Sequence, residues 1–424
     1  MHGVGGWRAG IAACTPRPPQ GISIITSPQQ TARAGWPIIA LATAAGVIAA
    51  YQIGKVAPLL PELRQALDFD LVTGGLIASV INAVGCLLGL TTGLLADRIG
   101  RRRLLLAGLV LLCLGGLAGA AAASAIWLLL SRLLEGIGVV TIVVAAPAII
   151  AEAADPARAR LALGVWATYM PTGVALAMAS APAIAHATTW RGLWLIGALA
   201  VALFTLLCVF RLPRGLGQPG RGSGLSFAAA WKGAAARPGP WLLGACFGAY
   251  ALQWFAVMTW LPTLVIEATG SSAAAVGPFV ALAVAVNVVG NIAGGRLLQA
   301  GFAPSTLIAV VSVALGAIGL FIMTPATDAT LRLVLACLFS SVGGIIPGAT
   351  FAAAPRHSPS PALMGAVNGL IVQGSNLGVL LGPPVLALMV QFGGGWQGAR
   401  WVMPAAGLTG LGLALLLRRL ERRI

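Results

Sequence analysis

A succession of apolar segments, each about 20 residues long, restricts the fold of this chain more than any other feature. A helix of about 20 apolar residues spans the hydrocarbon core of a bilayer, because each residue adds about 1.5 Å of length. The sequence therefore predicts an all-α polytopic membrane protein with twelve transmembrane helices. The expected spans are 36–59, 71–96, 104–124, 127–151, 160–184, 190–211, 240–266, 273–299, 304–323, 330–353, 362–391 and 396–418.

The composition excludes the main alternatives to a helical membrane protein. Only 8% of the 424 residues are charged and 58% are hydrophobic, whereas a soluble domain carries about 25% charged residues. A soluble enzyme and a disordered chain are excluded on this ground. An outer-membrane barrel would show short alternating segments instead of long apolar runs. The net charge of +16 is interpreted as a signal of membrane topology, not of nucleic-acid binding.

The basic residues indicate which side of the membrane holds the termini. An even number of spans places both termini on one side, and assigning that side to the cytoplasm puts 20 of the 26 basic residues there. The other side carries acidic residues such as Glu62, Asp68 and Asp70. Because positive residues collect on the cytoplasmic side, we predict an inner-membrane protein with both termini in the cytoplasm.

The spans divide into two groups of six around a polar stretch rich in Gly, Pro and Arg. We expect a disordered cytoplasmic tail over 1–34, a six-helix bundle over 35–211 and a cytoplasmic linker over 212–239. A second six-helix bundle over 240–418 and a cytoplasmic tail over 419–424 complete the expected organisation.

An internal repeat relates the two groups of helices. A shift of 201 residues matches Gln52 with Gln253, Pro61 with Pro262, Gly93 with Gly294 and Pro182 with Pro383. Because six is an even number, the two halves have the same orientation and their pseudo-twofold axis runs along the membrane normal. Two such halves can rock about a central site, so the repeat favours a transporter that works by alternating access.

The loop after the second expected span reads Gly93-Leu-Leu-Ala-Asp97-Arg98-Ile-Gly100-Arg101-Arg102-Arg103. This segment resembles the GxLaDrxGrrr signature of the major facilitator superfamily. The resemblance implies two parallel-repeat six-helix bundles and a conformational latch formed by Gly93, Asp97, Arg98, Gly100 and Arg101. An acid at this position can pair with arginines and helix ends and so hold the halves in one state. The alternative is a topology signal without a gating role.

A motif in the fourth expected span also resembles this superfamily. The segment from Leu128 to Gly138 fits the pattern LxxxRxxxG, with Arg132 as its charged position. A bare arginine in mid-span costs about 2.5–3.5 kcal/mol, and Glu135 lies on the same helix face. Two interpretations stay open: Arg132 binds substrate or relays protons, or it forms a structural pair with Glu135. Glu135 is the candidate for carrying a coupling proton.

Polar side chains in otherwise apolar spans are the candidates for a substrate site near the midplane. If Arg132 pairs with Glu135, Lys55 is left for a ligand, and a cation among amides suits a small anion. Lys55 can alternatively extend to water at the outer end of its span, and single Asn or Gln residues can serve interhelical hydrogen bonds. The candidates are Tyr51, Gln52, Lys55, Arg132, Tyr169, Gln253, Trp254, Asn287 and Asn376.

These features predict a secondary active transporter that moves a small solute through the lipid bilayer. The leading hypothesis is proton-coupled uptake of a small organic or inorganic anion, and the alternative is proton-antiport efflux of drugs or metabolites. The fifth span around Pro171 matches the drug-antiporter signature gxxxGPxxGG poorly, which disfavours efflux. Trp190-Arg191 and the segment from Gln373 to Gly378 resemble the cyanate-transporter-like branch of the superfamily.

Other function classes lack the residues that they require. The chain contains no HxxH, HxxxH or CxxC pair and no GxxxxGK[ST] phosphate loop, so we expect no metal, no cofactor, no nucleic acid and no primary pump. An intramembrane enzyme would need clustered catalytic groups, and we expect none. A non-transporting sensor with the same fold stays open. The resemblance implies a monomer.

Overall fold

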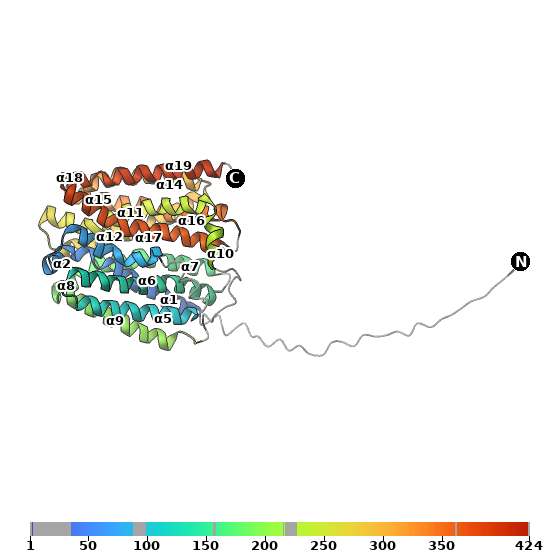
Figure 1. Cartoon of the computed structure of the whole chain (residues 1–424), viewed down its shortest axis with the longest axis horizontal. Coiled ribbons are helices and arrows are strands. Elements are labelled where there is room, and N and C mark those ends of the chain that lie inside the picture. The colour runs from blue at the N-terminus through green and yellow to red at the C-terminus, as the bar shows by residue number, and fades with distance from the viewer. Residues whose placement is uncertain are drawn as a thin grey trace.

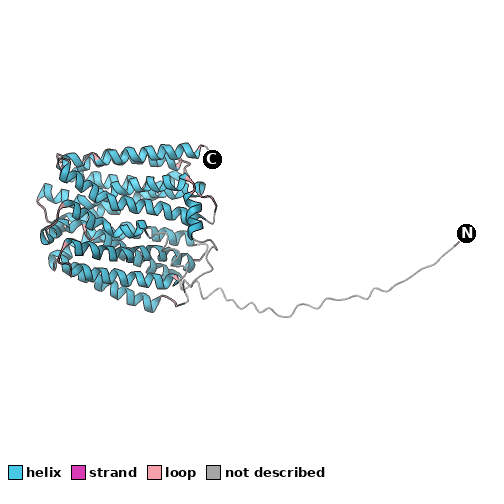
Figure 2. Ribbon diagram, viewed as in Figure 1, coloured by secondary structure: helices cyan, strands magenta, loops and turns pink. Residues whose placement is uncertain are grey.

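The structure is a computed structural model of the chain that describes residue 2 and residues 35–87, 99–155, 158–214, 216, 227–360 and 363–422. The described residues are mainly helical, and none of them lies in a strand. The helices run side by side along one direction and form a compact bundle, with the C-terminus at one end (Figures 1 and 2). The expected tail over 1–34 lies outside the described residues, apart from His2.

The N-terminal bundle contains the helices that precede the polar stretch at about residue 215. Its elements are α1 (Gly35–Gly54), η1 (Ala57–Leu59), α2 (Leu60–Leu67), α3 (Leu71–Ser79), η2 (Val80–Asn82), α5 (Arg101–Ala120), α6 (Ala125–Ala153), α7 (Ala159–Ala167), α8 (Tyr169–Ala187) and α9 (Trp190–Arg211).

The C-terminal bundle follows α10 (Phe227–Ala235), a short helix inside the expected linker. Its elements are α11 (Pro238–Thr269), α12 (Ala273–Ala285), α13 (Asn287–Gln299), α14 (Pro304–Met323), α15 (Ala329–Gly343), α16 (Ile345–His357), α17 (Met364–Phe392), α18 (Gly395–Ala399) and α19 (Val402–Glu421).

Eleven helical stretches of the described chain are long and apolar enough to cross a membrane. The remaining expected span begins as the shorter apolar stretch Leu71–Leu87, and residues 88–98 after it lie outside the described part. The structure therefore confirms a multi-pass, all-helical membrane protein. Two elements were not anticipated, since α2 fills the connection between the first two spans and α10 lies in the linker.

Several spans consist of two helices, which the apolar runs alone do not indicate. The fifth breaks at Thr168, the eighth at Val286 and the tenth at Gly344. Proline accounts for two of these breaks, because Pro171 and Pro347 have no backbone N–H for the carbonyl four residues earlier. Broken helices in transporters place polar backbone and side chains near a central site.

Five helices of the described part of the chain begin with a side chain that caps the first turn, which fixes where each span starts. Asp70 Oδ1 accepts a hydrogen bond of 2.8 Å from Thr73 N, and Asp328 Oδ1 accepts one of 2.8 Å from Thr330 N. Ser124, Thr189 and Ser272 cap their helices in the same way. These caps begin the second, fourth, sixth, eighth and tenth spans and therefore belong to one end of the bundle.

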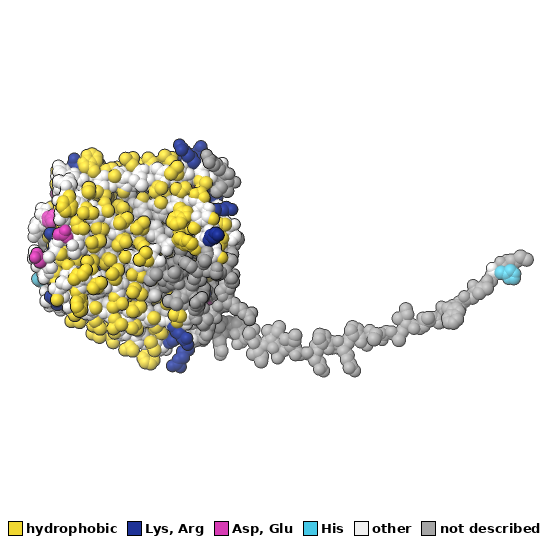
Figure 3. Space-filling view, in the orientation of Figure 1, with side chains coloured by type: hydrophobic (Ala, Val, Ile, Leu, Met, Phe, Trp, Pro, Cys, Tyr) yellow, Lys and Arg dark blue, Asp and Glu magenta, His cyan; other side chains and the backbone are white. Residues whose placement is uncertain are grey.

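Hydrophobic packing follows the two-bundle division only in part. One core cluster lies within the N-terminal bundle and another within α10 and the C-terminal bundle, while the largest draws residues from both. A broad apolar band covers much of the face of the molecule that Figure 3 shows. Lys and Arg side chains gather near the end that holds the C-terminus, and Asp and Glu side chains near the opposite end (Figure 3). The side of the membrane that each end faces stays a prediction.

Candidate functional site

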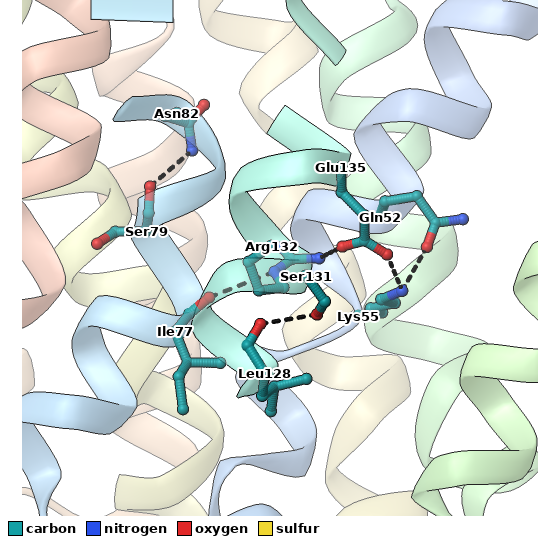
Figure 4. Close-up of polar contacts among 9 residues, drawn as sticks. All are labelled: Gln52, Lys55, Ile77, Ser79, Asn82, Leu128, Ser131, Arg132 and Glu135. Atoms are coloured by element: carbon teal, nitrogen blue, oxygen red, sulfur yellow. Dashed lines mark hydrogen bonds and ion pairs between the residues drawn. The ribbon is translucent and has the colours of Figure 1, made fainter. Parts of the chain in front are cut away.

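The N-terminal bundle holds a buried ionic network that we call the N-half charge cluster: Gln52, Lys55, Arg132 and Glu135. Lys55 Nζ donates hydrogen bonds to Glu135 Oε1 at 2.8 Å and to Gln52 Oε1 at 2.6 Å (Figure 4). Arg132 donates to the second carboxylate oxygen of Glu135. Each of these four side chains is almost completely buried. Glu135 is thus shared by two cations.

The local sequence explains how the charge cluster assembles. Arg132 and Glu135 are three residues apart on α6, so they lie on one helix face. Lys55 directly follows α1, and its backbone N–H still donates to Tyr51 O at 3.0 Å. A Cβ added at Gly115 of α5 would lie 2.7 Å from Glu135 Cγ, so the glycine makes room for the acid.

Trp194 and the α3 backbone provide further partners for the two cations. Lys55 Nζ lies 4.2 Å from the centre of the Trp194 ring, which is within range of a cation–π interaction. Arg132 Nε donates to the backbone oxygen of Ile77 in α3 at 3.3 Å, while its Nη2 is buried without a hydrogen-bond partner. With Glu135 ionised, the cluster carries a formal charge of +1 inside an apolar bundle.

The charge cluster bears on two predictions about Lys55, namely that it is free for a ligand and that it extends to water. The structural pair of Arg132 and Glu135 is present, but the inference that this pairing leaves Lys55 for a ligand is wrong. Lys55 binds the Glu135 oxygen that Arg132 does not use. Extension of Lys55 to water is also wrong, because its side chain is only 1% exposed. A role for Arg132 in substrate binding or proton relay stays a prediction.

The C-terminal bundle holds an uncharged network that we call the C-half polar cluster: Tyr250, Trp254, Asn287 and Ser340. Asn287 Nδ2 donates to Tyr250 Oη at 3.1 Å and to the backbone oxygen of Ser340 at 2.9 Å. Trp254 Nε1 donates to Ser340 Oγ at 3.0 Å. Asn287 begins α13 directly after the break in the eighth span, so the cluster joins α11, α13 and α15 at a helix discontinuity.

The other predicted substrate residues lie apart from these two networks. Tyr51 Oη lies 2.9 Å from Ser180 Oγ on α8, and the Tyr169 ring stacks on Trp166 at 4.3 Å. Gln253 is fully buried, and its Nε2 donates to Ala249 O at 3.3 Å.

Asn376 lies where α17 meets the helix after η2. A Cβ added at Gly85 would lie 2.6 Å from Asn376 Nδ2, so the two residues are in close contact. The predicted substrate residues therefore do not form one site: some belong to the two networks, Asn376 lies at a contact between the bundles, and Tyr51, Tyr169 and Gln253 have partners of their own.

Sequence reasoning missed Tyr250, Ser340, Trp194 and Ser180 as partners in these networks. Tyr250 and Ser340 carry the signal that identified the other candidates, because they are polar residues in apolar spans. Trp194 gives no such signal, since a tryptophan in an apolar run is typical of ordinary packing.

The expected latch is described only in part. Gly93, Asp97 and Arg98 lie outside the described residues. Gly100 has φ of 96°, a backbone conformation that favours glycine. Arg101 forms an ion pair of 3.6 Å with Glu152, and this pair lies within the N-terminal bundle. A latch role for these residues stays a prediction.

The two bundles meet through a pair of related contacts that we call the gate contacts. A Cβ added at Gly75 of α3 would lie 2.9 Å from Pro383 C and O and from Pro384 Cα on α17. A Cβ added at Gly277 of α12 would lie 2.6 Å from Met178 O and 3.4 Å from Pro182 Cγ on α8. The internal repeat relates Pro182 to Pro383, so the two contacts are pseudo-equivalent.

A small cavity lies between the bundles, next to the gate contacts. Its volume is about 20 Å³, which is close to the space that one water molecule needs. One wall comes from the end of α1, η1, α3 and α8, and the other comes from α11. Its lining residues are Ile53, Gly54, Ala57, Ala78, Val174, Met178, Trp254, Phe255, Met258 and Thr259.

Comparisons with known proteins place this arrangement among transporters. The chain is 30% identical over 199 residues to the arabinose-proton symporter of Escherichia coli K12, which is 46% of this chain and 41% of the symporter. The match thus spans less than half of that relative. The 3-(3-hydroxy-phenyl)propionate transporter of Escherichia coli K12 is 26% identical over 85% of this chain and 88% of its own length.

Solved structures and a family profile extend the match to most of the chain. The crystal structure of a bacterial homologue of the human lysosomal transporter Spinster, inward-facing and unoccupied, matches with a TM-score of 0.75 and 18% identity. This match covers 94% of this chain and 98% of that structure, so it shows the same fold. The model for the Major Facilitator Superfamily matches residues 42–373. The chain therefore belongs to the Major Facilitator Superfamily, which is a family of transporters.

Proposed function

We propose that this transporter couples the uptake of a small anion to the entry of protons across the bacterial inner membrane. Both termini lie in the cytoplasm, and the bundles over 35–211 and 240–418 move relative to each other. The observation that carries the proposal is the N-half charge cluster, in which one acid is shared by two cations. This cluster is the main buried ionic feature of the described spans.

The charge cluster links a proton to an anion through its own charge. Protonation of Glu135 removes the negative charge and leaves Lys55 and Arg132 as two uncompensated cations. At a separation of about 10 Å and a dielectric constant of about 20, one unit charge changes the energy of an anion by about 1.7 kcal/mol. Such coupling is reciprocal. A bound anion therefore favours protonation of Glu135 by the same free energy. Proton and anion are therefore taken up together.

The named relatives support both halves of this proposal. The arabinose-proton symporter and the galactose-proton symporter of Escherichia coli are named for proton coupling, although each match covers less than half of the chain. The relative that matches over most of its length is named for a phenylpropionate, which is a carboxylate. Net positive charge in the cluster suits a carboxylate better than a neutral sugar.

The gate contacts support alternating access. In the proposed topology they lie on the outer side, because α2, which directly precedes α3, lies at the end of the bundle away from the C-terminus (Figure 1). The closely packed Gly75 and Gly277 then close the outer path in this conformation. Gly100 and Arg101 of the proposed latch lie on the opposite, cytoplasmic side in this topology.

Efflux of drugs by proton antiport is the weaker candidate. A carrier of lipophilic cations needs a buried acid that is available to the cation. Glu135 is bound on both oxygens by Lys55 and Arg132. A cationic drug would have to displace one of these side chains.

Ligand-dependent thermal stabilisation of the detergent-purified chain tests the proposal. A ligand at a hundredfold excess over its Kd stabilises the folded state by about 2.7 kcal/mol. Acetate, benzoate, sulfate, arabinose and methyl viologen would be compared. We expect stabilisation by an anion that is weakened in Lys55→Ala and unchanged in Lys232→Ala, which removes an exposed cation. Stabilisation by methyl viologen alone would favour efflux and contradict the proposal.

A further inference from the structure

Of the substrate residues predicted from the sequence, only Trp254 lines the cavity between the bundles. Its lining includes two Met, one Trp and one Phe, and Thr259 contributes its one side-chain hydroxyl. The Trp254 Nε1 is already bound to Ser340 Oγ, so the indole offers its ring and not its donor. The wall of this cavity is therefore almost entirely apolar.

The position of the cavity places it on the path between the two bundles. Ile53, Gly54 and Ala57 line it from the N-terminal bundle, while Trp254 and Met258 line it from α11. A solute that moves by alternating access has to pass between these walls. The lining residues are thus placed to contact the solute itself.

One short segment serves both the cavity and the charge cluster. Ile53 and Gly54 line the cavity, whereas the neighbouring Gln52 and Lys55 hold Glu135 inside the bundle. Successive residues of a helix point in different directions, about 100° apart. An apolar contact surface and a buried positive charge therefore lie next to each other.

We propose that this cavity binds the apolar body of the substrate, which makes the substrate a monocarboxylate with an aryl or alkyl ring rather than a polyhydroxylated solute. The inference rests on the proposed uptake of anions. A sugar in this cavity would leave its hydroxyl groups without hydrogen-bond partners, which is unfavourable away from water. An apolar ring gains from leaving water and contacts Trp254, Phe255 and Met258.

The small size of the cavity indicates how the ligand enters. A volume of about 20 Å³ holds one water molecule and not a ring. The ligand is bound when α11 moves away from the N-terminal bundle, which is the motion that alternating access requires. Met178 and Met258 suit such a site, because their unbranched side chains adapt to different shapes.

Binding isotherms of the detergent-purified full chain test the inference. The probes are benzoate, cyclohexanecarboxylate, acetate and arabinose, measured by calorimetry at one pH. We expect benzoate and cyclohexanecarboxylate to bind at least 10-fold more tightly than acetate, and arabinose at a hundredfold excess not to compete. Met258→Ala is expected to weaken benzoate binding about 5-fold or more and leave acetate unchanged. Met389→Ala, which removes a 40% exposed methionine of α17, is expected to change neither.

The outcomes separate this inference from the proposed function. Equal affinity for acetate and benzoate, or equal effects of Met258→Ala on both, would overturn the apolar site and leave anion uptake standing. Binding of arabinose without binding of any carboxylate would overturn both. The comparison of the four probes in the unmodified chain holds even if a variant fails to fold.

Discussion

Lys55 and Glu135 form an ion pair of 2.8 Å inside the N-terminal bundle, with side chains that are 1% and 0% exposed. The two residues are 80 positions apart, and Lys55 directly follows α1 whereas Glu135 lies on α6. Arg132 occupies the other oxygen of the same carboxylate. The acid is thus the common partner of both cations, and its loss should have a larger effect than the loss of either cation.

Removal of the shared acid and removal of one of its two cations should lower the stability of the protein by different amounts. Glu135→Gln leaves two buried cations without a counter-charge, and removing one partner of a buried pair costs about 3–5 kcal/mol. Lys55→Met leaves a neutral pair of Arg132 and Glu135, so we expect a smaller loss. Thermal unfolding of the two purified variants measures the difference. A larger loss in Lys55→Met would show that Lys55, not Glu135, holds the cluster together.

A methyl group at Gly75 should open the contact between the bundles. Gly75→Ala places a Cβ 2.9 Å from Pro383 and Pro384, and neither backbone can move without separating α3 from α17. We expect longer distances between spin labels at Gln65 of α2 and Ala268 of α11, which are both exposed. Gly412→Ala is the matched control, because a Cβ there meets no atom within 4 Å. Unchanged distances in Gly75→Ala would contradict a gate at this contact.

The cap of α15 predicts a pH dependence. Hydrogen bonds from the backbone N–H groups of Leu331 and Thr330 hold the pKa of the Asp328 carboxyl below its usual value. Because the pKa is lower in the folded state, the stabilisation is present above the unfolded value of about 3.9 and is lost as the pH falls through the folded value.

Two variants separate the charge of Asp328 from its capping hydrogen bond. Asp328→Ala is expected to lower the midpoint of thermal unfolding at pH 7, with a difference from the unmodified chain that shrinks below pH of about 4. Asp328→Asn keeps a capping oxygen and should remove only the pH-dependent part. A deficit in Asp328→Ala that stays constant at every pH would contradict the assignment.

The spans could be predicted from the sequence because a bilayer requires about 20 apolar residues for each crossing. The helix breaks could be predicted only in part. Pro171 and Pro347 mark two of them, whereas no proline accompanies the break at Val286. The short helices α2 and α10 were missed, since amphipathic segments of eight or nine residues lie below the length of a membrane span.

At the candidate site, contacts within one helix could be predicted from the sequence, whereas contacts between helices could not. The spacing of Arg132 and Glu135 on one helix face indicated their pairing as one of two open interpretations, and the structure shows that ion pair. The attachment of Lys55 to the same acid depends on how α1 packs against α6, which no local pattern encodes. The division of the polar candidates between two separate networks depends in the same way on the rotation of each helix about its axis.

The number of protons taken up with each bound anion tests the central claim most directly. Calorimetry of benzoate binding to the detergent-purified chain, in buffers with different ionisation enthalpies, gives this number. No membrane is present, so a leak of protons across a bilayer cannot affect it. The account predicts uptake of up to one proton per benzoate by the unmodified chain, and none by Glu135→Gln, which should still bind the anion. Binding without proton uptake in the unmodified chain, or undiminished uptake in Glu135→Gln, would contradict it.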